Sequence, residues 1–243
     1  MKTVLITGAS RGIGAEIARV FAKNGYKVVV NYNQSKAQAE ELVKEITEAG
    51  GQAIAIQADV SVHSDVKAMW QALPPEYRKI DVLINNAGIS QQKMFADITE
   101  RDWDKMFDVT VKGAYNCLQM ALPVMVNEKW GRIINISSMW GQVGASCEVH
   151  YSAAKGAIIA MTKALAKEMG LSGITVNCIA PGVIDTEMNS LLDEDTLGHL
   201  AAATPMGRLG TPADVAQAAL WLADEKADFI TGQVIGVNGG FII

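Results

Sequence analysis

Short apolar runs alternate with longer segments of helical periodicity along the chain. The short runs are rich in β-branched residues, as is typical of strands buried on both faces of a parallel sheet. The longer segments repeat apolar residues at helical spacing, which indicates amphipathic helices. The pattern therefore predicts one α/β domain with a doubly wound parallel sheet of about seven strands. The predicted strands are Thr3–Thr7, Lys27–Tyr32, Gln52–Gln57, Asp81–Asn85, Arg132–Ser137, Thr175–Ile179 and Val234–Val237. The predicted helices include Ile13–Lys23, Lys36–Ala49, Ser64–Ala72, Arg101 to about Val126, Ser152–Met169 and Pro212–Ala223.

The composition supports a globular protein, with 49% hydrophobic residues, 19% charged residues and a net charge of -5. The 21 basic residues are dispersed among 26 acidic ones, so we expect no nucleic-acid partner. No apolar stretch approaches the roughly 20 residues needed to span a bilayer, so we expect no membrane partner. The opening segment leads directly into a glycine motif, which favours a cytoplasmic protein without a signal peptide. The three cysteines are widely spaced and form no CxxC pair, so we expect reduced thiols and no metal site.

The segment from Gly182 to Leu209 is long for a connection between a strand and a helix. Loops longer than about 12 to 15 residues in a compact domain usually have a function. This one contains apolar, helix-compatible residues, among them the run MNSLL at 188–192. We therefore expect a substrate lid at about 183–209.

A glycine-rich turn, TGASRGIG, follows the first predicted strand, with Gly8, Gly12 and Gly14 at the point where the strand turns into a helix. Glycine lets the backbone approach a pyrophosphate, whose charge is met by N–H groups at the helix N-terminus. A tight structural turn is the alternative. The strand before it and the amphipathic helix after it favour a nucleotide site.

Four further motifs follow in order along the chain: NNAG at Asn85–Gly88, YSAAK at Tyr151–Lys155, PG at Pro181–Gly182 and NGG at Asn238–Gly240. Together with the TGxxxGxG spacing of the glycine turn, they resemble the motifs of the short-chain dehydrogenase/reductase family. The resemblance spans the whole chain. It implies a single-domain Rossmann fold and an NAD(P)-dependent oxidoreductase that interconverts a ketone and an alcohol.

The resemblance also implies where the cofactor binds. The expected cofactor contacts are Gly8, Ser10, Arg11, Gly12, Ile13, Gly14, Asn31, Tyr32, Asn33, Asp59, Val60, Asn86, Ala87, Gly88, Tyr151, Lys155, Pro181, Gly182, Ile184 and Thr186.

The end of the second predicted strand bears on which nicotinamide cofactor is used. An acidic residue there would bond the free 2′-hydroxyl of NADH and repel the 2′-phosphate of NADPH. The strand ends in Asn31, Tyr32 and Asn33 without an acid, and Arg11 supplies a cation that can pair with a phosphate. We expect NADPH in preference to NADH; Arg11 as a plain surface charge is the alternative.

Tyr151 and Lys155 are four residues apart in a helical segment, so their side chains lie on one face. A phenol has an ordinary pKa near 10, which a neighbouring ammonium lowers. The resemblance implies that Tyr151 gives its proton to the carbonyl oxygen and that Lys155 also holds the nicotinamide ribose. Ser138 follows the fifth predicted strand, and the resemblance favours it over Ser137 as the residue that polarises the carbonyl.

The chain departs from the family at one catalytic position. The family has an Asn in the long helix after NNAG, where it holds a water that connects the lysine to solvent. The corresponding stretch here, DVTVKGAYN, has Thr110 at that place. The resemblance thus leaves open whether Thr110 or another group completes the proton relay.

The identity of the ketone stays open between two main alternatives, with a small xenobiotic or steroid ketone as a third. Overall the chain resembles the 3-oxoacyl-acyl-carrier-protein reductases, for which the partner is an acyl carrier protein. Segment 137–155 resembles more closely the elongation factor P 5-aminopentanone reductases, which reduce a ketone on a modified lysine of that factor. Glu148 in this segment would attract a substrate ammonium, or be a solvated loop charge. Lys129 and Arg132 remain as basic residues for docking an acidic carrier protein.

Two further expectations follow from the resemblance. Related chains pair through two long helices and through their carboxyl ends, and the apolar ending GGFII fits burial against another subunit, so we expect a homotetramer. A non-catalytic regulator that senses NADPH is the alternative from another class. Such proteins typically lose the tyrosine or the lysine, and both are present here.

Overall fold

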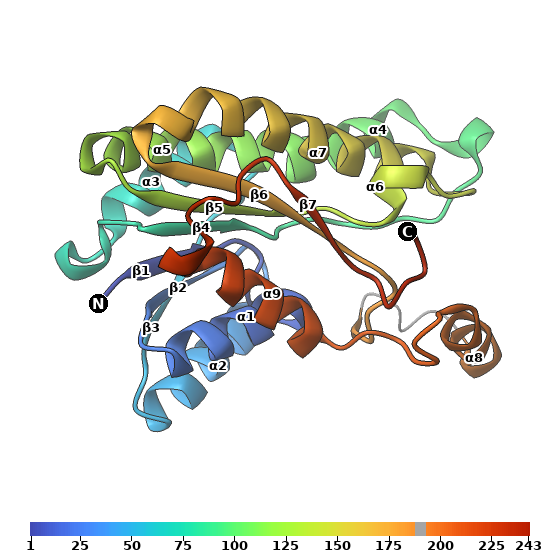
Figure 1. The fold of residues 1–243 in the computed structure, drawn as a ribbon, viewed down its shortest axis with the longest axis horizontal. Coiled ribbons are helices and arrows are strands. Elements are labelled where there is room, and N and C mark those ends of the chain that lie inside the picture. Colours follow the sequence, from blue (N-terminus) through green and yellow to red (C-terminus); the bar gives the residue numbers. More distant parts are fainter. Residues whose placement is uncertain (188–192) are drawn as a thin grey trace.

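The computed structural model describes residues 1–187 and 193–243. Its centre is a seven-stranded parallel sheet with the strand order β3-β2-β1-β4-β5-β6-β7 (Figure 1). The predicted α/β fold is confirmed, and each predicted strand is present with ends shifted by at most two residues. The strands are β1 (Thr3–Ile6), β2 (Lys27–Tyr32), β3 (Gln52–Gln57), β4 (Val82–Asn85), β5 (Gly131–Ile136), β6 (Ile174–Pro181) and β7 (Val234–Val237).

Helices cover both faces of the sheet, with α1, α2 and α9 on one face and α3, α5 and α7 on the other (Figure 1). No helix in the described ranges is long and apolar enough to cross a membrane. The α-helices are α1 (Gly12–Lys23), α2 (Lys36–Glu48), α3 (His63–Ala72), α4 (Glu100–Phe107), α5 (Gly113–Glu128), α6 (Trp140–Val143), α7 (Val149–Met169), α8 (Glu194–Ala203) and α9 (Pro212–Ala223).

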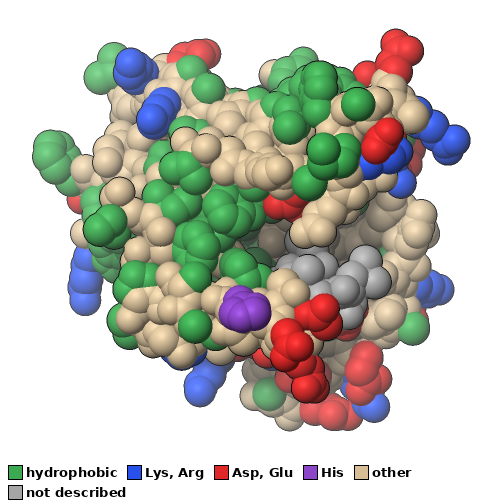
Figure 2. All heavy atoms as spheres, turned by 90° about the vertical axis from the view of Figure 1, so that its right-hand side faces the viewer, with side chains coloured by type: hydrophobic (Ala, Val, Ile, Leu, Met, Phe, Trp, Pro, Cys, Tyr) green, Lys and Arg blue, Asp and Glu red, His purple; other side chains and the backbone are tan. Residues whose placement is uncertain are grey.

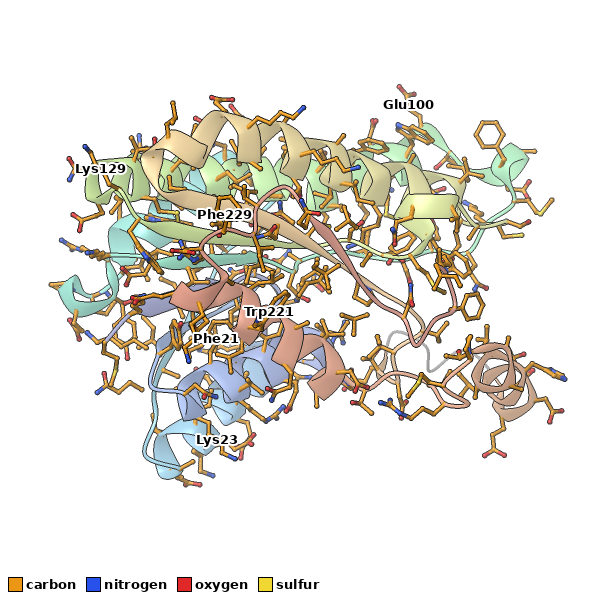
Figure 3. The ribbon with its side chains drawn as sticks, viewed as in Figure 1. Phe21, Lys23, Glu100, Lys129, Trp221 and Phe229 are labelled. Atoms are coloured by element: carbon orange, nitrogen blue, oxygen red, sulfur yellow. The ribbon has the colours of Figure 1, made fainter. Side chains whose placement is uncertain are left out.

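The strands read as continuous apolar runs because alternate residues enter two separate cores. Leu5 and Leu83 pack under α3, α5 and α7, whereas Val4 and Ile84 pack against α1, α2 and α9, and all four are fully buried. Phe21, on α1, fills the core between the sheet and helices α1, α2 and α9 (Figure 3). Burial on both faces leaves the two ends of the strands as the places where a ligand can reach the sheet.

The segment predicted as one helix from Arg101 to about Val126 is helical throughout but is not a single regular α-helix. It is divided into α4 and α5 by a π-helical segment, η3 (Asp108–Lys112). The β-branched run Val109–Val111 has lower helix propensity than its surroundings, and π-helical turns inside helices frequently occur at functional sites. Thr110 lies in this segment and is buried.

The strand order reverses between β1 and β4, which lie side by side although the chain passes through β2 and β3 between them. In open α/β sheets, ligands bind outside the carboxyl ends of the strands at such a reversal. The glycine turn, the NNAG motif and the loop before α6 all follow carboxyl ends of strands and therefore meet at this edge.

The segment predicted as a lid also lies at this edge. It starts with an isolated bridge between Ile184 and Gly210. Its helix α8 begins at Glu194 and is capped by Asp193, whose carboxylate accepts a hydrogen bond of 2.7 Å from the N–H of Thr196. The apolar run at 188–192 lies outside the described residues.

Candidate active site

The glycine turn joins β1 to α1 with an unusually close approach of backbone segments. Gly8 and Gly12 have φ angles of +61° and +55°, in the left-handed region that favours glycine. A Cβ atom on Gly14 would lie 2.6 Å from Nδ2 of Asn86 and 2.7 Å from the carbonyl oxygen of Gly8. Any side chain at position 14 would therefore separate α1 from the loop after β4.

A set of hydrogen bonds between Thr7, Gly8 and Asn86 joins the carboxyl ends of β1 and β4. Asn86 Nδ2 donates to the carbonyl oxygens of Thr7 and Gly8, at 2.9 and 3.0 Å. Thr7 Oγ1 accepts from the backbone N–H groups of Asn86 and Ala87, both at 3.0 Å. The sequence analysis included Asn86 and Ala87 but missed Thr7, which the threonine directly before Gly8 could have signalled.

The N-terminus of α1 is free to bind an anion. Its N-cap residue, Arg11, has extended backbone and no side-chain hydrogen bond to the first turn, and that turn holds no acidic residue. Within the described residues, the unpaired N–H groups and the positive end of the helix dipole are therefore left without a side-chain acceptor. A pyrophosphate fits this position.

The residues predicted to contact adenosine have different roles in the structure. Asn31 is buried, accepts from the N–H of Gly8 at 3.3 Å and donates to the carbonyl oxygen of Ala58 at 3.2 Å, so it supports the glycine turn. Asn33 is exposed and donates to Asp59 at 3.0 Å. Burial alone would raise the pKa of Asp59, but hydrogen bonds from Ser61 and Asn33 hold it below its ordinary value.

Two cavities, of about 830 and 570 Å³, occupy the carboxyl edge of the sheet. Figure 2 views this edge and shows a hollow with hydrophobic side chains gathered beside it. The glycine turn lines the first cavity, and Ser138, Tyr151 and Lys155 line the second. Every predicted cofactor residue lines one or both. The residues shared by both walls are Ile13, Asn86, Gly88, Ile89 and Thr186.

The candidate catalytic side chains come from the loop after β5 and from α7. Lys155 is buried, and its Nζ donates to the carbonyl oxygen of Ile136 at 2.9 Å and lies 5.7 Å from the centre of the Tyr151 ring. Ser137 Oγ donates to the carbonyl oxygen of Lys155 at 2.8 Å. Ser138 Oγ accepts the N–H of Trp140 at 3.2 Å, so the hydroxyl proton of Ser138 is directed to another acceptor.

Burial favours the neutral forms of both titratable groups. It lowers the pKa of Lys155 to about 8 and raises the pKa of Tyr151 to about 12. A hydrogen bond from Ser138 acts in the opposite direction on the phenol, while the nearby carboxylate of Glu148 raises its pKa further.

Thr110 faces the same space as Lys155. A Cβ atom on Gly88 would lie 3.3 Å from Lys155 Nζ and 3.9 Å from Thr110 Oγ1. The hydroxyl of Thr110 is buried and has no hydrogen-bond partner in the described part of the chain. Such an atom is costly unless a water or ligand satisfies it.

The segment between Ser138 and Tyr151 contributes only partly to the second cavity. Trp140 and Glu148 line it, whereas Cys147 and His150 do not. Burial raises the pKa of Glu148, and no ion pair or hydrogen bond to its carboxylate occurs within the described residues.

The basic residues considered for carrier docking lie away from both cavities. Arg132 is buried at the amino end of β5 and stacks at 4.6 Å from the Trp130 ring. Lys129 follows α5 at the same end, opposite Glu100, which lines the first cavity (Figure 3). Neither residue lies at the mouth of a cavity in its own chain, because β5 enters the sheet at the opposite edge.

Comparison with known proteins agrees with this geometry. The family model described as enoyl-(acyl carrier protein) reductase matches residues 8–242. The chain is 43% identical over 239 residues to a 3-oxoacyl-acyl-carrier-protein reductase of Staphylococcus aureus, covering 98% of this chain and 97% of the relative. The reductases of that name from Synechocystis and Thermotoga maritima are 40% and 38% identical over 243 and 242 residues, covering 100% of this chain and 97% and 98% of the relatives.

The chain belongs to the short-chain dehydrogenase/reductase family, as its motifs predicted. It is an NAD(P)-dependent oxidoreductase of the ketone and alcohol class. The alternative of a non-catalytic NADPH-sensing regulator is not supported by these relatives.

The buried amine of Lys155 predicts a specific dependence of stability on pH. Between pH 8 and 10 the unfolded chain keeps this lysine protonated while the folded chain releases the proton, so the free energy of unfolding increases with pH. We expect a contribution of about 2 kcal/mol across this range that is absent in Lys155→Met. Urea unfolding at several pH values measures it. Lys163→Met, on the exposed side of α7, is the control and should follow wild type; parallel curves for Lys155→Met and wild type would contradict the burial.

Proposed function

We propose that this chain reduces a ketone to an alcohol with NADPH, and that the ketone is a 3-oxoacyl group on an acyl carrier protein. One observation carries the proposal: Ser138, Tyr151 and Lys155 line a cavity that shares a wall with the glycine-turn cavity. The names of the relatives from Staphylococcus aureus and Synechocystis support this substrate.

Each of the three residues has a separate role in this proposal. Ser138 donates a hydrogen bond to the ketone oxygen, because its own Oγ already accepts from Trp140. Tyr151 gives its proton to that oxygen, and the protonated amine of Lys155 stabilises the phenolate left behind. The bound nicotinamide supplies the hydride. With a pKa of about 8, Lys155 is mainly protonated at neutral pH.

Two neighbouring features extend the proposal. The unpartnered hydroxyl of Thr110 supports a role in holding a water against Lys155, in place of the family Asn. Thr196 and Leu200 of α8 line the second cavity, which supports α8 as the described part of the lid over the substrate.

The preference for NADPH rests on charge at the adenosine end of the first cavity. Asn31, Tyr32 and Asn33 line it without an acid at the end of β2. Arg11 also lines it, and among the described residues its one ion pair is with Glu187, at 3.4 Å and with both side chains exposed. An exposed ion pair is worth little, so Arg11 can turn to a phosphate.

We expect Arg11→Ala to raise the Kd of NADPH about 10-fold and to leave that of NADH nearly unchanged, since only NADPH carries the 2′-phosphate. Fluorescence titration with both cofactors measures this. The control is Lys23→Ala, at the far end of α1 (Figure 3). Unchanged NADPH affinity in Arg11→Ala would assign the preference to other residues.

Glu148 supports a second substrate, the ketone on the modified lysine of elongation factor P. Its carboxylate lines the second cavity without a partner among the described residues, and burial raises its pKa. A substrate ammonium would relieve this cost, whereas an acyl thioester would not. The positions of Lys129 and Arg132 away from the mouth also weaken the case for an acidic carrier.

Turnover of an acetoacetyl thioester and of an amino ketone, each with NADPH, separates the two substrates. Tyr151→Phe removes the proton donor and is expected to lower kcat with either substrate by about 100-fold or more. Glu148→Gln is expected to raise the KM of the amino ketone about 10-fold relative to that of the thioester if the second substrate is right. No NADPH oxidation with any ketone would contradict the proposed reaction.

We further propose a cytoplasmic homotetramer. Tyr115 and Val126 on α5, and Phe229 and Ile243 near the carboxyl end, are large exposed apolar residues on the two surfaces through which family members pair. Light scattering of the purified protein should give four times the chain mass. A monomer at micromolar concentration would contradict the proposal.

A further inference from the structure

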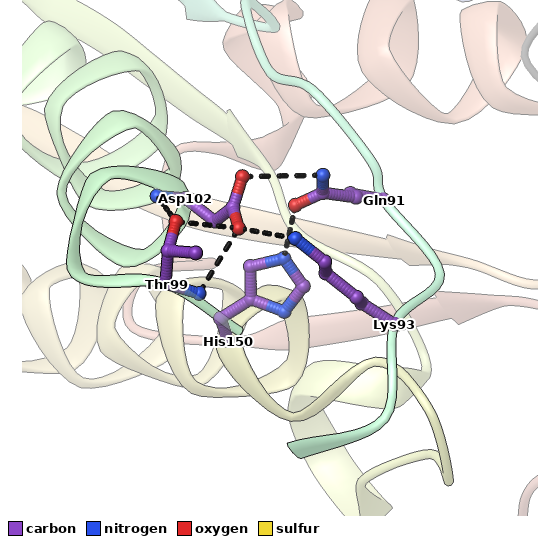
Figure 4. Close-up of polar contacts among 5 residues, drawn as sticks. All are labelled: Gln91, Lys93, Thr99, Asp102 and His150. Atoms are coloured by element: carbon purple, nitrogen blue, oxygen red, sulfur yellow. Dashed lines mark hydrogen bonds and ion pairs between the residues drawn. The ribbon is translucent and has the colours of Figure 1, made fainter. Parts of the chain in front are cut away.

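A chain of polar side chains runs from α4 to the first turn of α7, outside the two cavities (Figure 4). Gln91 Nε2 donates to Asp102 Oδ1 at 3.3 Å, and Gln91 Oε1 lies 3.1 Å from Nε2 of His150. His150 is fully buried and directly precedes Tyr151. The hydrogen-bond chain therefore ends one residue from Tyr151, the proposed proton donor.

The partners determine the orientation of each group. The carboxylate of Asp102 can only accept, so the amide nitrogen of Gln91 must face it and the amide oxygen must face His150. Nε2 of His150 consequently carries the hydrogen and donates to Gln91. Nδ1 is buried without a partner among the described residues, and burial lowers the pKa of His150, so the ring is neutral.

The carboxylate of Asp102 is held firmly in place at one end of this hydrogen-bond chain. Its carboxylate accepts from the backbone N–H and the hydroxyl of Thr99, at 3.0 and 2.7 Å, as part of the capping box of α4. It also pairs with Lys93 Nζ at 2.7 Å. The hydrogen bonds from Lys93 and Thr99 hold the pKa of Asp102 well below its ordinary value, so it stays ionised at working pH.

The hydrogen-bond chain connects three segments: α4, the loop around Gln91 and the first turn of α7. These segments line the two cavities or carry the candidate catalytic groups. Gln91 stands between Ser90 and Gln92, and both of these line the second cavity. The N–H of Lys93 also donates to the carbonyl oxygen of Cys147 at 2.7 Å, which ties the same loop to the segment before α7. Of the bonds from this loop, the one between His150 and Gln91 reaches the helical turn that carries Tyr151.

We propose that Gln91 and His150 are positioning residues that set the place of the Tyr151 hydroxyl relative to Ser138 and the bound ketone. The inference rests on the proposed role of Tyr151 as proton donor. A buried hydrogen bond to the first turn of α7 limits how far that turn can rotate or shift. A displacement of the acid by about 1 Å costs on the order of 100-fold in rate.

The matched variants His150→Leu and His150→Gln test this. Leucine removes the donor, whereas the amide nitrogen of glutamine can donate from about the place of Nε2. We expect His150→Leu to lower kcat about 10-fold to 100-fold with little change in the KM of the ketone or the Kd of NADPH. His150→Gln should recover most of the lost kcat. Equal kcat in the two variants, or full kcat in His150→Leu, would overturn the inference.

Gln91→Met provides a second, independent test. It removes the same hydrogen bond from the other side, so the double variant with His150→Leu should be no slower than either single variant, and additive losses would overturn the inference. His63→Leu removes a histidine–amide contact of 3.3 Å to Asn116, which joins α3 to α5 and does not involve α7, and is the control expected to keep wild-type kcat.

A measurement without substrate separates this inference from the proposed function. If wild type turns over no ketone, the proposed function fails. Crystal structures of wild type and His150→Leu then decide the inference on their own. We expect the distance between the Tyr151 hydroxyl and Ser138 Oγ to change by about 1 Å in the variant. An unchanged distance would overturn it.

Discussion

The hydrogen bonds that join Thr7, Gly8 and Asn86 across the carboxyl ends of β1 and β4 determine where the other functional groups can lie. These strands are neighbours at the reversal of strand order, and the helices that follow them cover opposite faces of the sheet. A crevice opens between them, and its depth depends on how closely the two loops approach. Because position 14 carries no side chain, the free N-terminus of α1 and the NNAG backbone line one cavity.

The catalytic end of the crevice depends on burial. Desolvation lowers the pKa of Lys155 and raises that of Tyr151, so both effects favour a protonated phenol and make release of its proton difficult. Few groups among the described residues compensate: the Ile136 carbonyl accepts from the amine of Lys155, and a hydrogen bond from Ser138 lowers the pKa of the phenol. In so sparse a set the place of the Tyr151 hydroxyl matters, which gives the Gln91–His150 bond its importance.

Much of the fold and the candidate site was predictable from local pattern. All strands were found within two residues at each end, because buried parallel strands are short, apolar and bounded by turn residues. The differences between prediction and structure came from features that the hydrophobic periodicity of the sequence does not encode. The π-helical segment around Thr110 interrupts an otherwise regular helical pattern, and Lys129 and Arg132 lie at the wrong edge of the sheet for the docking role considered. A basic residue near a motif in sequence can lie a full strand length from it.

The sequence by itself determined the α/β class, the number of strands, the family, and which motifs follow the carboxyl ends of strands, because each of these depends on residues close together in the chain. Only the tertiary structure decided the burial of Lys155, the unpartnered hydroxyl of Thr110, the desolvation of Glu148 and the bond between Gln91 and His150. These depend on pairs of segments far apart in sequence. Their distances and their access to water are set by how the helices pack on the sheet.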